Sequence, residues 1–270
     1  MIGVIAKGGV GKSRVLKQMG LYVGTAQGGR RFLYSAMEDG RLGQFKRICD
    51  STFESKVDEK GNVIKGSKVL KNMLLDEKYD NEKLTVATKK VMRETYGDRF
   101  MIDDYVGMNG ERYSDLVEAH IRKYGRLDVL GVDGLSMMDG TGNELHDVGV
   151  NTKELKDLAK KYNICVVVLI HVPKGTKRDV RDGWEHARGS SKILDNCDGF
   201  LALSNLKKDE SEFEWDEVEE DENPDIWDEN HLYFYWWGKR LSGKKVWKIF
   251  KLNEEDMLYE PTSLGLGDFG

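Results

Sequence analysis

The sequence predicts an α/β protein whose mostly parallel central sheet is covered by helices on both faces. Short apolar runs of strand length alternate with segments of helical periodicity, a pattern typical of parallel sheets buried on both sides. A glycine-rich segment containing lysine and serine, Ala6–Ser13, lies between the first apolar run and the first helical segment. The 270 residues fit one large domain and are too few for two of ordinary size. We therefore expect a single domain over residues 1–270.

Eight apolar segments are expected to form strands. The first six are core strands of the parallel sheet, and the last two form a C-terminal antiparallel hairpin across a turn at residues 241–243. In chain order the segments are Ile2–Ala6, Arg31–Ala36, Arg99–Asp103, Leu127–Asp133, Ile164–Ile170, Gly199–Leu203, His231–Trp237 and Lys245–Leu252.

Helices are expected between these strands. One follows Gly11, a second covers Leu42–Ser51, and a third covers Asn151–Tyr162, where apolar residues recur on one face. Residues 53–97 are rich in lysine and glutamate, and we interpret them as an inserted pair of helices joined by turns such as residues 59–62.

The charge of the chain is unevenly distributed. Residues 207–230 contain thirteen acidic residues and two lysines and so carry −11, whereas the whole chain carries −5 and the other 246 residues +6. Acidic runs of this kind are most often solvated loops, which we expect here; a regulatory or decoy role is the alternative. Without this acidic loop, the charge of the chain is compatible with binding to nucleic acid.

The compartment is suggested by the apolar runs and the cysteines. No run approaches eighteen apolar residues, so we expect no transmembrane helix and no membrane partner. An apolar strand begins directly after Met1, which argues against a secretory signal. Cys49, Cys165 and Cys197 are far apart and lack metal-ligand spacing, which argues against a disulfide scaffold or a zinc site. We expect a cytoplasmic protein.

The segment Ala6–Ser13 has the composition of a phosphate-binding loop. Its glycines let backbone N–H groups approach phosphate oxygens, and the helix that follows adds the positive end of its dipole. Lys12 is expected to neutralise the β- and γ-phosphates, and Ser13 to offer its hydroxyl to Mg²⁺. The alternative is a glycine-rich turn without function. The sequence thus predicts ATP and Mg²⁺ as cofactors, with ATP bound by Lys7, Gly8, Gly9, Val10, Gly11, Lys12, Ser13 and Arg14.

Three further predicted strands end in polar residues. Asp133 ends a buried strand, where a carboxylate could orient Mg²⁺ and its waters. Glu38 and Asp39 follow the second strand, where either could align the water that attacks the γ-phosphate, or the two could cap a helix. His171 follows the strand Ile164–Ile170, and a single histidine there could equally be structural. Because carboxyl ends of parallel strands meet at one edge, we expect a common site.

The order of these motifs resembles the RecA-type motor of hexameric replicative helicases, the DnaB-like group, and within it the compact plasmid helicase RepA and its phage relatives. The resemblance covers nearly the whole chain except residues 53–97 and the acidic loop. It implies a RecA-like P-loop ATPase core, an ATP-dependent DNA helicase motor that translocates on single-stranded DNA in replication, and a homo-oligomeric, hexameric ring. The motifs are Ala6–Ser13, Met37–Asp39, the strand ending at Asp133, Leu169–His171 and Arg188–Ser191.

The resemblance also implies roles for single residues. Glu38 matches the catalytic glutamate that polarises water, and His171 matches the residue that senses the γ-phosphate and couples it to the DNA-contacting loop. The hairpin at residues 238–243 resembles the place where phage helicases carry an arginine finger, which we assign to Arg240. The finger position of the plasmid helicase is occupied here by Asp198.

The segment from residue 172 to 187 is basic and contains glycines, and in a helicase it would line the channel for single-stranded DNA. Acidic residues dilute its charge, so an ordinary exposed loop is the alternative. The residues expected to bind DNA are Lys174, Lys177, Arg178 and Arg181.

Two other functions remain open from the sequence. Lys7 and the glycines after it are also similar to the variant phosphate loop of the ParA/MinD partition ATPases, which act as nucleotide-switched dimers. The other alternative is a related RecA-fold ATPase that acts in recombination, loading or defence. The position of Glu38, the strand end at His171 and the segment Arg188–Ser191 argue against the partition switch.

Overall fold

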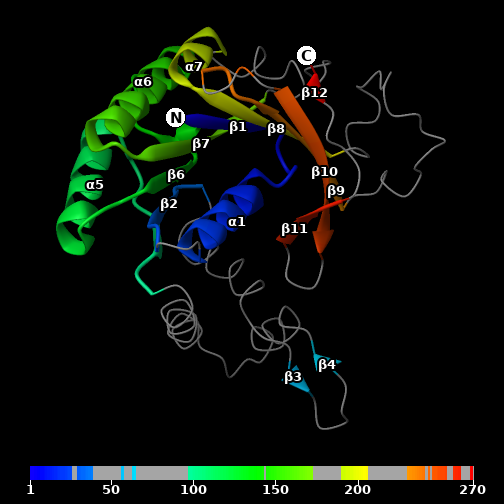
Figure 1. Cartoon of the computed structure of the whole chain (residues 1–270). Coiled ribbons are helices and arrows are strands. Elements are labelled where there is room, and N and C mark those ends of the chain that lie inside the picture. The colour runs from blue at the N-terminus through cyan, green and yellow to red at the C-terminus, as the bar shows by residue number, and fades with distance from the viewer. Residues whose placement is uncertain are drawn as a thin grey trace, which may run out of the picture.

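A ten-stranded mixed sheet forms the centre of the computed structural model (Figure 1). Its strand order is β11-β10-β9-β8-β1-β7-β6-β2-β5, with β12 paired to β10. The structure describes residues 1–25, 29–38, 56–57, 63–64, 97–142, 144–172, 190–205, 230–240, 243, 245–253, 258–262 and 268–269. The strands of this sheet are β1 Ile2–Ala6, β2 Phe32–Ala36, β5 Phe100–Asp103, β6 Val129–Asp133, β7 Cys165–His171, β8 Gly199–Asn205, β9 His231–Trp237, β10 Lys245–Asn253, β11 Leu258–Pro261 and β12 Asp268–Phe269.

The six predicted core strands form the parallel part of the sheet, β8-β1-β7-β6-β2-β5. The predicted mostly parallel sheet is therefore confirmed. The connecting helices are α1 Lys12–Thr25, α5 Gly110–Tyr124, the 3₁₀ helix η1 Leu135–Met137, α6 Glu144–Tyr162 and α7 Ser190–Asn196.

Strand β7 shows why the core strands have continuous apolar runs. Val166 and Val168 belong to the core cluster formed with α5, α6 and α7, whereas Val167 and Leu169 belong to the cluster formed with α1. Side chains of a strand point alternately to its two faces. Since both faces are covered, the positions from Val166 to Ile170 are buried and favour apolar residues.

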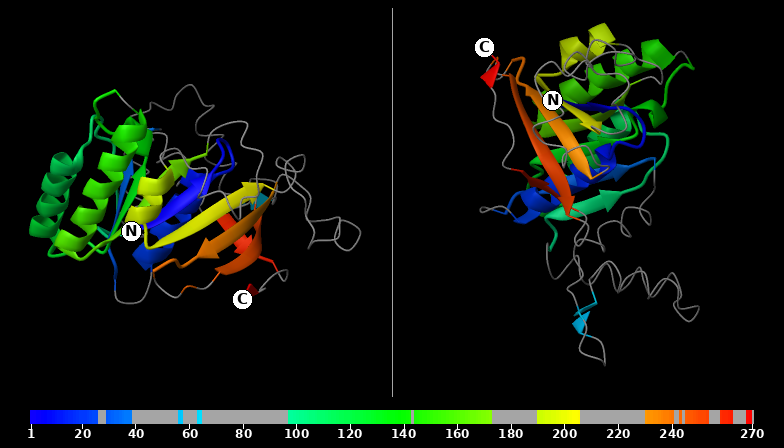
Figure 2. Two further views of the ribbon diagram at one scale, coloured as in Figure 1. Left: turned by 90° about the horizontal axis from the view of Figure 1, so that it is seen from above. Right: turned by 90° about the vertical axis from the view of Figure 1, so that its right-hand side faces the viewer.

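The C-terminal strands continue the sheet in antiparallel order. Strands β9 and β10 pair as predicted, and Gly243 N–H donates to the Gly238 carbonyl at 2.8 Å across their turn. Aromatic rings pack between them, with the centroids of Phe234 and Phe250 4.2 Å apart. In Figure 2 these strands, orange to red, extend the sheet away from α5 and α6.

Some elements differ from the sequence-based expectation. Helix α6 begins at Glu144, seven residues before the predicted start, and α5 was not among the predicted helices. Of the proposed helical insert at residues 53–97, the structure describes β3 Lys56–Val57 and β4 Val63–Ile64, together with residue 97. These strands pair antiparallel around the turn expected between helices, so a β-hairpin stands at that position.

Several expectations concern residues that lie outside the described part of the chain. These are the helix at 42–51, Cys49 and the acidic loop up to residue 229. The two described cysteines, Cys165 and Cys197, are free thiols. Among the described helices, none is both long and apolar enough to cross a membrane.

Candidate nucleotide site

The register of the sheet brings the predicted site residues to one edge. Ala6, the last residue of β1, is opposite His171, the last residue of β7. Ala36, the last residue of β2, is opposite Asp133, the last residue of β6. The phosphate loop leaves the sheet directly after Ala6, and Glu38 follows two residues after Ala36. The strand ends therefore assemble a candidate site as the sequence predicted.

The phosphate loop has a backbone that requires glycine at two positions. Gly9 has a φ of +80° and Gly11 a φ of +111°, a region that residues with a Cβ rarely adopt. At Gly11 a Cβ would also lie 2.8 Å from the hydroxyl of Tyr259. The Gly11 carbonyl accepts from Val15 N–H at 3.0 Å, which closes the first turn of α1. The loop thus opens directly into the helix N-terminus, where anions bind favourably.

The remaining loop residues differ in burial. Val10 and Lys12 are buried, and Gly8 and Gly9 are exposed. A Cβ at Gly8 or Gly9 would meet no atom within 4 Å, so space remains beside the loop. The other predicted ATP-binding residues are partly buried and comprise Lys7, Gly11, Ser13 and Arg14.

Lys12 is held over the loop by backbone oxygens. Its side chain is 5% exposed, and Nζ donates to the carbonyls of Ala6 at 2.8 Å and Lys7 at 2.9 Å. Burial lowers the pKa of Lys12 to about 8, against the opposing effect of the carboxylates of Glu38 and Asp133. Phosphate oxygens would add negative charge beside this amine and favour its protonated form.

Asp133 is the buried carboxylate of the site. It is 1% exposed, and its Oδ2 accepts a hydrogen bond of 2.5 Å from the hydroxyl of Tyr34 on β2. Its backbone carbonyl accepts from Met37 N–H at 3.2 Å, which ties the end of β6 to the residue before Glu38. A hydroxyl that donates to a carboxylate favours the charged form of the carboxylate and fixes its orientation.

Glu38 and His171 form a pair across the site edge. Glu38 Oε2 lies 3.5 Å from His171 Nε2, and the two side chains are 48% and 39% exposed. Both predicted residues are therefore brought together and remain accessible to a ligand. Asp39, the other candidate for the base, lies outside the described residues.

The residues expected to hold Mg²⁺ offer oxygen ligands. Magnesium prefers oxygen and usually keeps several waters and phosphate oxygens beside one or two protein groups. The Ser13 hydroxyl on the first turn of α1 and the buried Asp133 carboxylate match this chemistry. No group of three or more His, Cys, Asp or Glu with metal-binding geometry occurs among the residues that the structure describes. One hydroxyl and one carboxylate therefore fit a cation that is bound together with the nucleotide.

Arg240 lies away from this edge. Its N–H donates to the Asp198 carbonyl at 2.8 Å, and its guanidinium donates to the Asp195 carbonyl at 2.7 Å. Asp198 precedes Gly199, which is opposite Ile2 at the start of β1. Arg240 is thus at the end of β1 opposite to the phosphate loop, and it does not join the site of its own chain.

The residues predicted to bind DNA, Lys174, Lys177, Arg178 and Arg181, lie outside the described residues. The described chain ends before them at Val172, one residue beyond His171, and resumes at Ser190 in α7. Val172 N–H donates to the Ala6 carbonyl at 3.2 Å, so the approach to this segment is joined to the strand that carries the phosphate loop.

Two tyrosines of the site were not anticipated from the sequence. Besides Tyr34, Tyr259 on β11 reaches the phosphate loop and places its ring 5.9 Å from the Arg14 guanidinium. The backbone of Tyr259 is held by Gln18 of α1, which donates to its carbonyl at 2.7 Å and accepts from its N–H at 2.8 Å. The contact joins residues 241 positions apart, so no local pattern could have indicated it.

Comparison with known proteins gives a consistent result for the fold. No protein-family model and no curated protein matches the sequence. The ATPase domain of G40P superposes with a TM-score of 0.71 at 13% identity, over 97% of this chain and 84% of that chain. A DnaB-like replicative helicase, solved in a study of its interactions with primase, gives 0.67 at 14% identity, over 96% of this chain and 56% of that chain. This chain therefore has the RecA-like ATPase fold of DnaB-like replicative helicases.

Proposed function

We propose that this chain is the motor of an ATP-dependent DNA helicase, which hydrolyses ATP and translocates along single-stranded DNA in replication. One juxtaposition carries the proposal: Lys12, Asp133 and the Glu38–His171 pair lie at a single edge of the sheet. The two solved structures described above, one a helicase ATPase domain and one a replicative helicase, support the same reading through their fold. The particular similarity to RepA stays a prediction.

Hydrolysis would use the residues at this edge as follows. The Lys12 ammonium, now held by two carbonyls, would turn to the β- and γ-phosphate oxygens and stabilise the charge of the transition state. Glu38 would orient the attacking water and accept its proton. Mg²⁺ bound with the nucleotide, near Ser13 and Asp133, would supply further neutralisation of the phosphates.

Coupling to DNA would pass through His171. Its Nε2 faces the Glu38 carboxylate at 3.5 Å, and the chain continues within two residues into the segment predicted to bind DNA. A change at the γ-phosphate that alters this pair would therefore reach that segment over a very short path. The basic residues of the segment would contact phosphates of the strand.

The position of Arg240 supports assembly into a ring. This residue lies at the opposite end of β1 from the phosphate loop, so it could contribute to hydrolysis only at the nucleotide of another copy. A homo-oligomeric ring, hexameric by the resemblance, would place the end of the β9–β10 hairpin of one copy against the site of the next.

The decisive measurement is ATP hydrolysis with and without single-stranded DNA. We expect strong stimulation by DNA, complete loss of turnover in Lys12→Ala, and bound but unhydrolysed ATP in Glu38→Gln, because that change removes the base and leaves the phosphate loop intact. Asp39→Asn is the matched control and should hydrolyse ATP normally. A hydrolysis rate that does not change when DNA is added, together with a nucleotide-dependent dimer in hydrodynamic measurements, would instead indicate the partition switch.

A further inference from the structure

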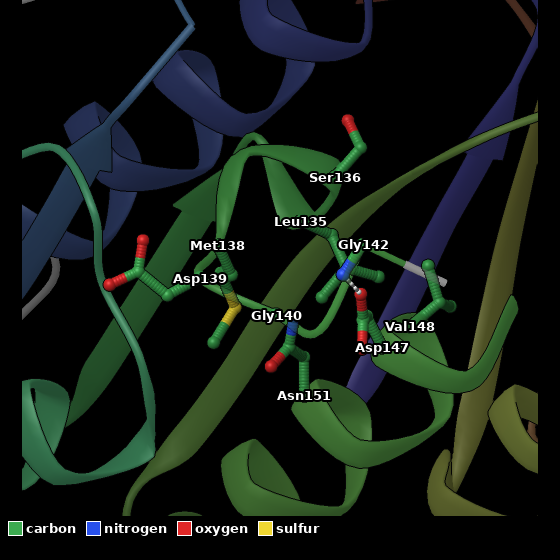
Figure 3. Close-up of a pocket in the computed structure, with 9 residues that line it drawn as sticks. All are labelled: Leu135, Ser136, Met138, Asp139, Gly140, Gly142, Asp147, Val148 and Asn151. Carbon is green, nitrogen blue, oxygen red and sulfur yellow. Dashed lines mark hydrogen bonds between the residues drawn. The ribbon is translucent and has the colours of Figure 1, made fainter. Parts of the chain in front are cut away.

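A pocket of about 330 Å³ lies between the loop that follows β6 and the first two turns of α6 (Figure 3). None of the residues assigned above to ATP or Mg²⁺ lines it. Its volume is at the lower end of the range of small-ligand pockets, so its occupant would be small. The loop starts directly after Asp133, so the pocket stands beside the nucleotide site at the same edge of the sheet.

Asn151 on α6 points into this pocket. It is 3% exposed, and Figure 3 shows its amide directed from the helix toward the loop at Gly140. Within the described residues, its side chain has no hydrogen-bond partner. Its amide atoms are not among the described polar atoms that are both fully buried and unpaired, so the amide is open to the pocket. An occupant of the pocket that offers a donor and an acceptor would satisfy this amide.

The other lining groups restrict the occupant further. Leu135, Met138 and Val148 are buried and give the pocket apolar walls. Among the described residues, the lining includes Asp139, which is paired with Arg112 from outside the pocket, and the carboxylate of Asp147, but no lysine or arginine, so it offers no positive charge to a phosphate. An uncharged, flat group with a hydrogen-bonding edge fits, and in nucleic acids that group is the base, whose edges asparagine reads in pairs of hydrogen bonds.

The pocket is held open by its own loop. Asp147 accepts from the N–H groups of Thr141 at 2.9 Å and Gly142 at 3.0 Å, which pins the loop to α6. Asp139 N–H donates to the Met108 carbonyl at 2.8 Å, which pins the other side to the loop before α5. A site that is already ordered binds its ligand without losing further conformational entropy of its own residues.

We propose that this pocket receives one base of the single strand bound by the motor, an inference that rests on the proposed function. Strand β7 ends at His171, next to the segment predicted to bind DNA, and it contacts the helix η1 in the loop that lines the pocket. A single strand bound by the motor at this edge of the sheet would therefore lie near the pocket. Every base has donors and acceptors on its edges, so the pocket responds to the presence of a base and not to its identity.

The test compares an oligonucleotide with the same oligonucleotide carrying abasic sites, by fluorescence anisotropy at several salt concentrations. Wild-type protein should bind the oligonucleotide that carries all its bases at least about fivefold more tightly than the abasic oligonucleotide. Asn151→Leu should lose this preference and keep its affinity for the abasic strand and its salt slope, since phosphate contacts are unaffected. Its melting temperature should change little, because Leu has nearly the same volume and the substitution removes no hydrogen bond between described residues.

The control variant is Thr152→Val. Thr152 is the next residue on α6, is fully buried and donates to the Val148 carbonyl at 2.8 Å, but it does not line the pocket. It should retain the base preference. An equal loss in this variant would mean that α6 was merely disturbed and would overturn the inference.

Two further outcomes separate this inference from the proposed function. Equal binding of both strands by a wild-type protein whose hydrolysis is stimulated by DNA would remove the pocket from the DNA path and leave the motor intact. Competition by a free deoxynucleoside as effective as that of the strand would assign the pocket to free nucleosides and overturn the inference. Failure to bind either strand, with no stimulation of hydrolysis, would contradict the motor itself.

Discussion

Tyr34 contributes a single buried hydroxyl to the candidate Mg²⁺ site. Its side chain is 1% exposed, and its hydroxyl donates to Asp133 Oδ2 at 2.5 Å. Desolvation alone would favour the neutral carboxylic acid at this buried position, whereas a hydrogen bond to the carboxylate favours the charged form. The same bond fixes the orientation of the Asp133 carboxylate, which in the proposed function would face the waters of Mg²⁺.

Replacing Tyr34 by phenylalanine should weaken divalent-metal binding with little effect on folding. Hydrogen bonds to charged groups contribute about 1.5–3 kcal/mol, so the affinity for Mn²⁺ in the presence of ADP should fall by about tenfold or more. Electron paramagnetic resonance of Mn²⁺ measures this directly, and nucleotide affinity without metal should change little. Tyr113→Phe is the matched control, because it also removes a buried hydroxyl but one that contacts Ser35. A parallel loss in both variants would contradict a specific role of Tyr34.

At the scale of elements, α5 contains a histidine in an apolar setting. His120 is 6% exposed, and its Nε2 has no hydrogen-bond partner in the described structure. Burial, and then the charges of Arg31 and Lys123, lower the pKa of His120 from 6.5 to about 4. The folded protein therefore keeps this imidazole neutral over a range in which the unfolded chain binds a proton.

The stability of the domain should consequently fall as the pH drops from 6.5 to 4. Above pH 6.5 the histidine is neutral in both states and contributes nothing to the pH dependence; below it, protonation favours the unfolded chain by up to roughly 3 kcal/mol. His120→Leu should flatten this part of the dependence and should not destabilise the protein at pH 7.5, since the unpaired nitrogen is removed. Urea unfolding at a series of pH values tests both, and an unchanged slope in the variant would exclude His120 as the cause.

Sequence patterns predicted best those elements whose residues are buried in the same way along most of their length. Strand β7 is apolar and buried from Val166 to Ile170 because both of its faces are covered. Helix α5 carried local signals that could have identified it, namely the Asn109 side chain that caps its first turn and the left-handed Gly125 that ends it. The strands β3 and β4 are two residues each, too short for any periodicity to distinguish them from helix.

At the scale of the whole molecule, substitution of Arg240 tests whether one copy of the chain supplies a residue to the nucleotide site of another copy. Arg240→Ala should bind ATP and still oligomerise but turn over far more slowly, since fingers of this kind contribute on the order of 10³-fold to hydrolysis. Mixing it with Lys12→Ala should restore part of the activity, because each variant supplies what the other lacks at a shared interface. The measurement is the hydrolysis rate against mixing ratio. Absence of complementation, or a normal rate of the single variant, would move the finger to Lys239 or Arg188.

The candidate site divides into a part that the sequence predicted and a part that it could not. Asp133 and His171 end their strands, and Lys12 and Glu38 follow theirs, so the rule that parallel strands end at one edge was sufficient to bring them together. Tyr34 is an interior residue of its strand, and its partner is 99 positions away. Contacts of that kind depend on which side chains meet once the whole sheet has formed. A local sequence pattern contains no information about them.

The Ala6 carbonyl oxygen accepts hydrogen bonds from two donors, and it thereby connects the phosphate loop with the residue that follows β7. It accepts from Lys12 Nζ at 2.8 Å and from Val172 N–H at 3.2 Å. A phosphate that draws the ammonium away leaves the oxygen to the amide alone, and an acceptor relieved of a charged donor binds its remaining neutral donor more strongly. In the proposed function, nucleotide bound at the phosphate loop would therefore strengthen the hydrogen bond between Ala6 and Val172, beside the His171 that ends β7.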